Sequence, residues 1–391
     1  MDRPPPLTVL TLFGTRPEII KLAPVIRALE TRPERFRAVN VASGQHADLL
    51  SPFVHIFSTR IDYNLHAMQP GQSLNALSSR VLASIDHVLE HEKPDAVLVQ
   101  GDTTTALMGA LAAFYRRIPV GHVEAGLRTS DAGQPFPEET NRRLISRLAS
   151  WHFAATRRNR RALVREGVPP DQIALTGNPI VDSLHAILAR HERSPRLQQI
   201  LDSTRMYRRI ALTTHHRESF GSMLEGNLRV LREFIERQTD VALIFPVNPN
   251  PVVRRTANAI LGNSDRIWLT EPLDYLDFIG LLSESWLIIS DSGRIQEEAP
   301  SLGKRVLVLR DVTERPEAIE AGMAKLVGDP HRLAAALKEE YWRSDNDTAP
   351  VVNPFGRGDS GLRIARALWR GFHSRPLSAR RPPKAAAKPS Q

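Results

Sequence analysis

Short apolar runs rich in β-branched residues alternate with longer amphipathic segments along almost the whole chain. The apolar runs are nearly continuous, as in Ala96–Gln100, Val241–Phe245 and Leu287–Ser290, which is typical of strands buried on both faces of a parallel sheet. The segments between them have the length and periodicity of helices, for example Pro17–Glu30 and Gly221–Arg237. Repeated strand–helix units of this kind predict an α/β fold with doubly wound parallel sheets.

The remaining elements follow the same two patterns. Further strands are expected at Leu7–Phe13, Ala38–Ala42, Val120–Val123, Trp151–Ala154, Ile173–Leu175, Arg209–Leu212, Arg266–Leu269, Arg305–Leu309 and Ala324–Val327. Further helices are expected at Ser73–His91, Thr103–Arg117, Glu139–Ser150 and Asn178–Arg190.

The elements group into two Rossmann-like domains. A domain change is expected near Gly177–Pro179, which gives an N-terminal domain of residues 1–177 and a C-terminal domain of residues 178–357. The helical segment 358–372 is too short to form a domain and is assigned to the N-terminal one. Ligands of open α/β sheets bind at the carboxyl ends of the strands, so a cleft between the two domains is the expected binding site.

Composition narrows the class of protein. Hydrophobic residues make up 41% of the 391 positions and charged residues 24%, which excludes a disordered chain, a collagen and a coiled coil. The absence of cysteine excludes disulfides, thiolate metal sites and cysteine nucleophiles. The start, MDRPPPLTVLTLFG, does not resemble a signal peptide, and no apolar stretch approaches the roughly 20 residues that span a bilayer. We therefore expect a cytoplasmic protein without membrane segments.

The formal charge of +9 raises the possibility of a nucleic-acid partner. Five Lys/Arg residues and no Asp/Glu lie in residues 375–391, within a Pro/Ala-rich tail (373–391) that is expected to be disordered. A solubilising tail is the favoured interpretation, and a tether to nucleic acid or anionic lipid is the alternative. A nucleic-acid partner is therefore not expected.

Two motifs follow the first strands. In FGTRPEIIK (13–21), Gly14 permits a tight turn and Pro17 suits the first helical turn, so Arg16 and Lys21 can meet an anion at the helix start. An ordinary strand–helix turn is the alternative. In VQGDTTTA (99–106), Asp102 ends a strand and serves either in the site or as a helix N-cap, with Thr103 available for the other task.

Carboxylates also follow the next strand. Glu124 ends the buried run of HVEAGLRT (122–129), where an unpaired carboxylate is costly to bury. Glu138 begins the following helix, where an interaction with the helix dipole explains it equally well. Together with Asp102 these residues form a candidate cluster for proton transfer, because neighbouring like charges raise one pKa.

The second domain opens with THHRES (214–219), in which His215 suits diphosphate binding and proton transfer; its spacing does not favour a metal site. In ISDSGRIQEEAPSLGK (289–304), a strand leads through Ser292 into a helix whose N-terminus can bind an anion. Glu298 on that helix can accept hydrogen bonds from ribose hydroxyls. A capped helix explains Ser292 but not the Glu pair or the later TERPEA (313–318).

Taken together, the motifs resemble those of the non-hydrolysing UDP-N-acetylglucosamine 2-epimerase family. FGTRPEIIK, SGQH (43–46), QGDTTTA, HVEAGLRT, PEETNRR, TGNPIVD, THHRES, DSGRIQEEAPSLGK and TERPEA occur in the family's order and spacing between Leu7 and about Gly322. The resemblance implies a glycosyltransferase-B-like fold and a homodimer. It also implies interconversion of UDP-N-acetylglucosamine and UDP-N-acetylmannosamine, by elimination of UDP and its re-addition, without metal or other cofactor.

The resemblance also implies roles for single residues. Asp102, Glu124 and Glu138 would be the acid–base carboxylates, and His215 would act beside the diphosphate. The implied substrate contacts are Arg16, Lys21, His46, Phe278 beside the uracil, Ser292, Gly293, Arg294, Glu298 and Arg315. Which carboxylate removes the proton and which returns it stays open.

Three positions depart from the family pattern. Arg294 replaces a usual glycine, so it either adds a charge for the diphosphate or obstructs it. His216 replaces an arginine and Asn248 a histidine, at positions that in bacterial members help to bind a second substrate molecule as activator. We predict that this activation is weakened or absent. The prediction fails if turnover of UDP-N-acetylmannosamine alone still requires added UDP-N-acetylglucosamine.

Other functions remain as alternatives. The same residues would serve a hydrolysing relative that releases N-acetylmannosamine and UDP. A retaining glycosyltransferase is less favoured, because no acceptor motif is visible. A homologue that binds nucleotide sugars without catalysing a reaction is a further alternative, because Arg294 could obstruct the diphosphate.

Overall fold

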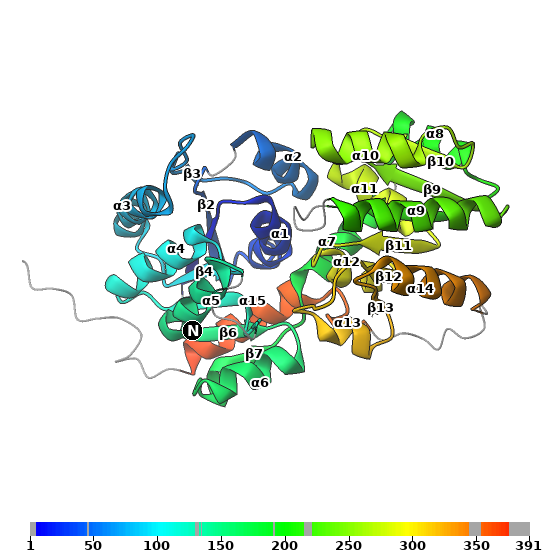
Figure 1. The fold of residues 1–391 in the computed structure, drawn as a ribbon. Helices are drawn as coiled ribbons and strands as arrows, with labels where there is room; N and C mark the ends of the chain where they lie inside the picture. The colour runs from blue at the N-terminus through cyan, green and yellow to red at the C-terminus, as the bar shows by residue number, and fades with distance from the viewer. Residues whose placement is uncertain are drawn as a thin grey trace, which may run out of the picture. The chain divides into compact units, whose positions relative to one another are not determined.

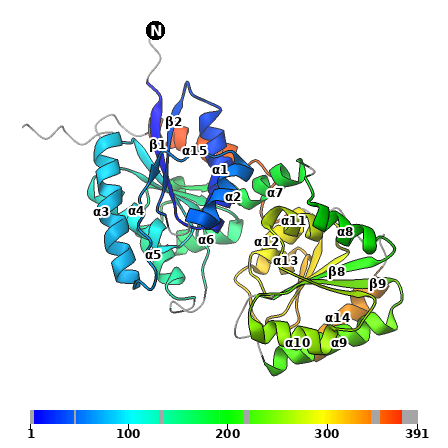
Figure 2. The ribbon, with the colours of Figure 1, turned by 90° about the horizontal axis from the view of Figure 1, so that it is seen from above.

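The computed structural model describes residues 5–44, 47–129, 133, 135–190, 192–214, 221–343 and 353–374. The chain divides into two compact units, of which one comprises Met1–Ser183 with Phe355–Gln391 and the other Leu184–Pro354. Each unit is built around a parallel sheet with helices on its faces (Figures 1 and 2).

The described part of the first unit contains a seven-stranded sheet in the order β3-β2-β1-β4-β5-β6-β7, with every pair parallel. The strands form because their apolar, β-branched residues are buried by both layers of helices; in β4 all five residues are buried. Their bounds are β1 Leu7–Phe13, β2 Phe36–Ala42, β3 Tyr63–Asn64, β4 Ala96–Gln100, β5 Val120–Ala125, β6 Trp151–Ala154 and β7 Ile173–Leu175.

Helices cover both faces of this sheet. One core joins β1, β2, β4 and β5 to α3 (Leu74–Glu92), α4 (Thr104–Tyr115) and α5 (Glu138–Leu148). On the opposite face, α1 (Arg16–Glu30) packs against the C-terminal helix α15 (Ser360–His373), as Figure 2 shows. The remaining helices are α2 Ala47–Phe57, α6 Arg157–Arg165, the short η1 Pro170–Gln172 and α7 Pro179–Leu188.

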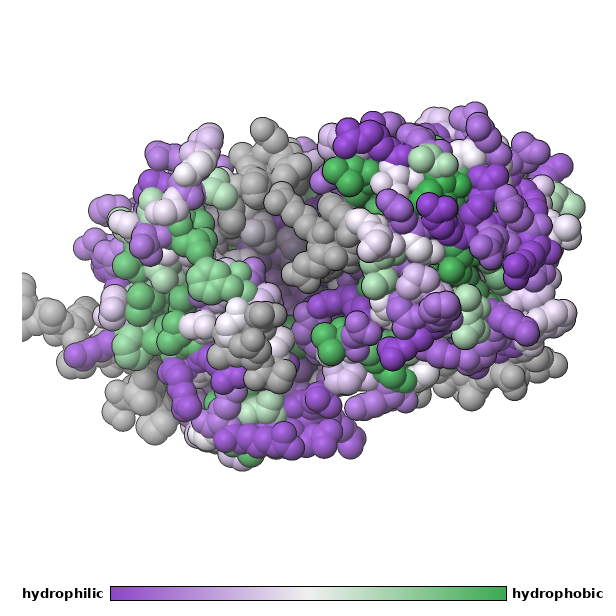
Figure 3. Space-filling model, in the orientation of Figure 1, coloured by the Kyte–Doolittle hydropathy of each residue, from purple (hydrophilic) through white to green (hydrophobic). Residues whose placement is uncertain are grey.

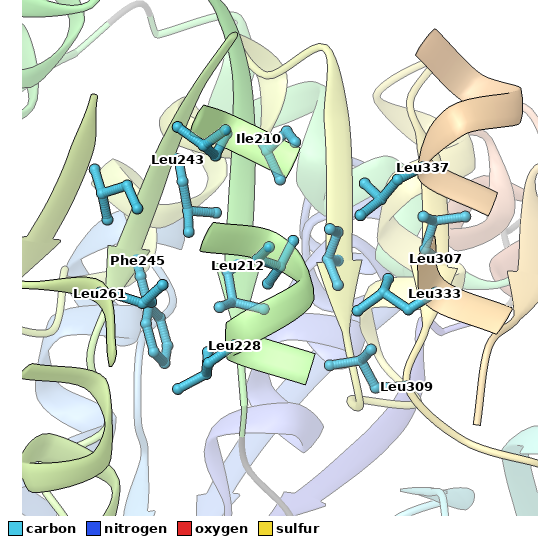
Figure 4. Packing of buried hydrophobic residues seen from close by; sticks show 14 of the residues in the cluster. Ile210, Leu212, Leu228, Leu243, Phe245, Leu261, Leu307, Leu309, Leu333 and Leu337 are labelled. Carbon is cyan, nitrogen blue, oxygen red and sulfur yellow. The ribbon is translucent and has the colours of Figure 1, made fainter. Parts of the chain in front are cut away.

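The described part of the second unit holds a six-stranded parallel sheet in the order β10-β9-β8-β11-β12-β13. Its main core lies between the sheet and α9 (Ser222–Arg237), α10 (Pro251–Leu261) and α14 (Pro330–Trp342), where Leu228, Phe245 and Leu333 pack (Figure 4). The strands are β8 Arg208–Thr213, β9 Val241–Pro246, β10 Ile267–Thr270, β11 Leu287–Ser290, β12 Arg305–Val308 and β13 Ala324–Leu326. The other helices are α8 Pro195–Ser203, α11 Tyr275–Ser283, α12 Ile295–Ser301 and α13 Pro316–Glu320.

The predicted α/β class with two doubly wound parallel sheets is confirmed. In each sheet the strand order reverses direction beside its first strand, between β1 and β4 and between β8 and β11. Ligands of doubly wound sheets bind at such switch points, outside the carboxyl ends of the strands. The candidate side chains are therefore expected, in the first unit, in the loops after β1 and β4 and, in the second unit, in the loops after β8 and β11. Among the described residues, no helix has both the length and the apolar content to cross a bilayer.

Candidate active site

Glu18 joins the two loops at the switch point of the first sheet. Its Oε2 accepts hydrogen bonds from the backbone N–H of Gly14 (2.9 Å) and of Thr15 (2.7 Å), while Oε1 accepts from Thr103 Oγ1 (2.7 Å). The side chain is buried, and burial raises the pKa of its carboxyl group above the ordinary value, although these hydrogen bonds oppose that effect. Glu18 is not among the residues predicted from the sequence. The spacing of Thr15 and Glu18 matches a capping box and could have indicated it.

Asp102 follows β4 and is held by α5. Arg142 donates to Asp102 Oδ2 through Nη2 at 2.6 Å and through Nε at 3.1 Å, and Asn141 Nδ2 donates to the Asp102 carbonyl at 2.8 Å. The side chain stays 26% exposed. Thr103 caps α4 by accepting from the N–H of Ala106 at 3.0 Å. Thr103 therefore supplies the side-chain cap, and the Asp102 carboxylate faces Arg142.

Glu124 occupies an unusual backbone position near the end of β5. Its φ of 64° lies in the left-handed region, and the pairing with β6 is irregular between Val123 and Ala125. A non-glycine residue in this region costs free energy, and a bulge redirects the side chain of the residue it contains. The strained backbone of Glu124 is thus a feature of the candidate site that the periodicity of the sequence does not reveal.

Three donors from separate parts of the chain orient the Glu124 carboxylate. Lys21 Nζ lies 2.5 Å from Oε1, Asn178 Nδ2 donates to Oε1 at 3.0 Å, and Gln100 Nε2 donates to Oε2. The Lys21 and Glu124 side chains are only 7% and 9% exposed, so the ammonium compensates the charge of the carboxylate away from bulk water. Lys21 thereby binds a carboxylate; its predicted phosphate contact stays a prediction.

A buried histidine supports the turn that carries Asp102. His122 Nε2 lies 2.7 Å from the carbonyl oxygen of Gly101, a residue with a φ of 70°. Burial lowers the pKa of His122 to about 3. The ring is therefore neutral at pH 7, and since a carbonyl only accepts, Nε2 carries the proton.

The two glutamates that begin α5 differ in their surroundings. Glu139 is fully buried and accepts from Arg142 Nη1 (2.9 Å), Arg143 Nε (2.7 Å) and the N–H of Thr129 (3.1 Å). Glu138, the predicted catalytic residue, is only half-buried at the first position of the helix. Glu139 thus anchors the helix, and the role predicted for Glu138 is compatible with its partly open position.

Of the remaining predicted residues, the structure describes Arg16 but not the histidines. Arg16 is exposed, and its guanidinium lies 5.8 Å from the ring centroid of Phe53. His46, and His215 and His216 of the second unit, lie outside the described residues.

At the switch point of the second sheet, Arg315 lies over the loop after β11. Its Nη1 is 2.6 Å from where a Cβ on Gly293 would stand, so a side chain at this position would displace the guanidinium. Arg315 Nε donates to Glu297 Oε1 at 2.6 Å, and its N–H donates to Thr313 Oγ1 at 3.0 Å. The structure therefore brings the predicted residues Gly293 and Arg315 together, and Ser292 is buried in the same loop.

Arg294 has φ −64° and ψ −39°, the conformation of an ordinary helical residue. The backbone at this position therefore does not require glycine. Nearby on α12, Glu298 is buried and accepts from Tyr275 Oη at 3.0 Å. Phe278, from the same helix α11 as Tyr275, is half-buried.

Asn248, another of the three departures from the family pattern, forms one hydrogen bond to the residue after β8 and another within its own loop. Its Nδ2 donates to the Thr214 carbonyl at 3.3 Å, and its Oδ1 accepts from the N–H of Asn250 at 3.0 Å. In the part of the chain that the structure describes, no group of three or more His, Asp or Glu side chains has the arrangement of a metal site.

Comparison with known proteins identifies the family. A sequence model described as UDP-N-acetylglucosamine 2-epimerase matches residues 27–369. The UDP-N-acetylglucosamine 2-epimerase of Salmonella typhimurium is 45% identical over 370 residues, which cover 93% of this chain and 98% of that protein.

Solved structures agree with this match. The structure of a putative UDP-N-acetylglucosamine 2-epimerase from Listeria monocytogenes superposes with a TM-score of 0.88 at 41% identity, covering 95% of this chain and 98% of that one. The Neisseria meningitidis UDP-GlcNAc 2-epimerase, solved with UDP-GlcNAc bound, gives a TM-score of 0.82 at 39% identity and covers 93% and 100% of the two chains. With its sequence motifs, its fold and these relatives matched over nearly their whole length, the chain belongs to the UDP-N-acetylglucosamine 2-epimerase family.

Proposed function

We propose that this chain is a non-hydrolysing epimerase that interconverts UDP-N-acetylglucosamine and UDP-N-acetylmannosamine. The observation that carries the proposal is Glu124. Its backbone is held in the left-handed region, and its carboxylate is fixed by Lys21, Gln100 and Asn178. Asp102 lies one strand away in the sheet, on the loop after β4. Two oriented carboxylates at one sheet edge suit a reaction that removes and returns a proton.

The reaction has two balanced steps. In the first, a carboxylate takes the proton from carbon 2, the electron pair forms the C1–C2 double bond, and the bond between C1 and the diphosphate oxygen breaks. The products are a 2-acetamidoglucal and UDP. In the second step, the diphosphate oxygen attacks C1 while a protonated carboxyl group delivers a proton to the opposite face of carbon 2. We assign these proton transfers to Asp102, Glu124 and Glu138 together.

The second unit would bind the departing UDP. Ser292, Gly293, Arg294 and Arg315 would contact the diphosphate, Glu298 the ribose hydroxyls and Phe278 the uracil. The arrangement of Arg315 over Gly293 supports a phosphate site, because a guanidinium offers several donors in the geometry that phosphate oxygens accept. Arg16, His46 and His215 complete the proposed substrate contacts.

One assay separates the candidate reactions. The pure protein is incubated with UDP-N-acetylglucosamine in ordinary water, and products are followed by proton NMR. We expect UDP-N-acetylmannosamine to accumulate to a constant ratio with the substrate. Stoichiometric free N-acetylmannosamine and UDP would instead show a hydrolase. If no product forms, the Arg294→Gly variant decides whether this arginine silences the site, because the backbone at position 294 accepts either residue.

We further propose a homodimer in which α4 and α5 contribute to the interface. Figure 3 shows apolar residues gathered over these helices, where Phe114 is 52%, Tyr115 67% and Leu144 48% exposed. Light scattering should give twice the monomer mass for the native chain and a monomer for Tyr115→Glu/Leu144→Glu. Val312→Glu, an equally polar change at an exposed site of the second unit, should leave the dimer intact. A monomeric native chain contradicts the proposal.

A further inference from the structure

The exposed face of α6 consists almost entirely of arginine. The helix reads RRNRRALVR and contains no acidic residue. Asn159 and Leu163 point into the unit and are buried, whereas Arg157, Arg160 and Arg161 are exposed. In Figure 3, hydrophilic residues gather along the lower edge of the first unit, where Figure 1 places α6.

These arginines surround a pocket that the proposed reaction does not use. Arg157, Arg160 and Arg161 line it together with Leu175, and its volume is about 570 Å³. Leu175 ends β7 and is 41% exposed, so it gives the pocket an apolar surface. The volume lies within the range of about 300–1,000 Å³ that is typical of small-molecule sites.

The three guanidinium groups have no carboxylate partner within the described residues. Among the described residues, the hydrogen bond found for these side chains is a weak one to the backbone, from Arg161 Nε to the Arg157 carbonyl at 3.4 Å. The nearest acidic residue along the chain, Glu166 at the end of the helix, is held by Arg128 at 2.7 and 2.8 Å. Within the part of the chain that the structure describes, no carboxylate therefore neutralises the positive charge of the pocket.

The arrangement also opposes the stability of the helix. Arg157 lies in the first turn, where the helix dipole repels cations, and it stands three and four positions before Arg160 and Arg161, where like charges repel. Thr156 and Asn159 already cap the helix start through mutual hydrogen bonds of 3.1 Å. A bound anion would relieve both repulsions through the guanidinium groups.

We propose that α6 and Leu175 form a binding site for a small molecule that carries two or more phosphoryl charges. Planar guanidinium groups pair with phosphate oxygens in a bidentate manner, and three of them match a diphosphate better than a single phosphate. The apolar part of the ligand packs on Leu175. The pocket favours a small molecule over a nucleic acid, because its charge is concentrated around one hollow with an apolar side.

The test measures the binding of inorganic pyrophosphate by calorimetry to the full chain saturated with UDP, so that the proposed substrate site is occupied. We expect one equivalent to bind the native chain, and the dissociation constant to rise at least tenfold in Arg160→Gln/Arg161→Gln. The matched control is Arg229→Gln/Arg237→Gln, which removes the same charge from two exposed arginines on α9. Its dissociation constant should equal that of the native chain.

Equal affinities in both variants, or no saturable binding, would overturn the site. Two further probes distinguish the ligand class: a 20-nucleotide RNA and vesicles containing phosphatidylglycerol, each tested with the same variants. If either binds through Arg160 and Arg161 while pyrophosphate does not, the small-molecule assignment is wrong. Epimerase activity, assayed in parallel, reports separately on the proposed function, because no residue of this pocket belongs to its machinery.

Discussion

At Glu124, the backbone conformation that orients the carboxylate costs stability. Its backbone lies in the left-handed region, and its ion-paired side chain is only 9% exposed. Lys21 and Asn178 fix Oε1, and Gln100 fixes Oε2. Such strain persists only where the surrounding structure holds it, and it occurs most often at functional sites.

The Glu124→Gln variant tests this residue. Loss of the acid–base group should lower kcat by about 10²–10⁴-fold, the usual contribution of general acid–base catalysis. The substitution also leaves the Lys21 ammonium buried without its countercharge, so thermal stability should fall. Adding Lys21→Met should restore stability but not turnover. The exposed Glu90→Gln serves as control, and activity of Glu124→Gln within tenfold of the native chain would refute the assignment.

His122 is expected to make the stability of the fold depend on pH. Its pKa of about 3 in the folded chain lies below the ordinary 6.5, so between these values the unfolded chain binds more protons and the fold loses stability as the pH falls. The loss is about 1.4 kcal/mol per pH unit in this window. Glu18, whose pKa is raised, acts in the opposite direction, so the measurement must compare variants.

Urea unfolding at pH 7 and pH 4.5 should therefore show a smaller decrease in the free energy of unfolding for His122→Gln than for the native chain. The exposed His185→Gln should retain the native decrease. Equal decreases in all three proteins would show that His122 does not cause the loss of stability at low pH.

The sequence predicts which single residues belong to the candidate site better than it predicts which side chains contact them. It singled out Glu124 because a carboxylate at the end of a buried strand has a cost that propensity does not explain, and it placed Asp102 at a strand end, either in the site or as a helix N-cap. It did not find that Arg142 holds Asp102, or that Gln100 and Asn178 hold Glu124. Those contacts depend on strand order, which places segments far apart in sequence at one edge.

At the scale of elements, the loops after β1 and β4 act as one unit because Glu18 connects them. Removing its side chain in Glu18→Ala would leave the N–H groups of Gly14 and Thr15 without acceptors and release Thr103. We expect the free energy of unfolding to fall by about 2–3 kcal/mol, from unsatisfied buried donors that cost about 1–3 kcal/mol each. Turnover should fall as well, since Asp102 precedes Thr103.

Glu18→Gln is the matched control, because its amide oxygen can still accept from the two backbone donors. Urea unfolding should place it within about 1 kcal/mol of the native chain, the net value of a typical hydrogen bond. If Glu18→Ala is as stable as Glu18→Gln, the carboxylate does not connect the loops.

Most elements were predictable because their apolar runs are long and clearly bounded. β1, β4, β6, β7 and β11 have the expected bounds, whereas β2 begins at Phe36, two residues earlier than expected. β3 was not predicted, since Tyr63–Asn64 is too short to carry a pattern and forms only by pairing with β2. The left-handed position of Glu124 within β5 was equally invisible, because it follows from tertiary packing.

At the scale of the molecule, the chain returns from the second unit to complete the first. Asp182 accepts from the N–H groups of Ser360 (3.1 Å) and Gly361 (3.0 Å), which fixes the start of α15. Gly361 allows α15 to approach α1, because a Cβ there would lie 2.4 Å from the Pro24 carbonyl oxygen. The C-terminal helix is thus part of the first unit's structure.

Gly361→Ala should therefore destabilise the chain even though alanine favours helices by about 1 kcal/mol over glycine. The backbone contact must open, with an expected net loss of about 1–3 kcal/mol, as for overpacked cores. Gly280→Ala on α11 is the control, since its Cβ would meet only the flexible end of Leu197. Thermal unfolding that ranks Gly361→Ala as the more stable variant would contradict the close approach.

The proposed epimerisation requires that carbon 2 of the sugar exchanges its proton while UDP is detached. The direct measurement is NMR of UDP-N-acetylglucosamine incubated with the enzyme in deuterated water. We expect UDP-N-acetylmannosamine that carries deuterium at carbon 2, because the removed proton is lost to solvent before the other face is protonated. UDP-N-acetylmannosamine that retains the original proton at carbon 2 would contradict it.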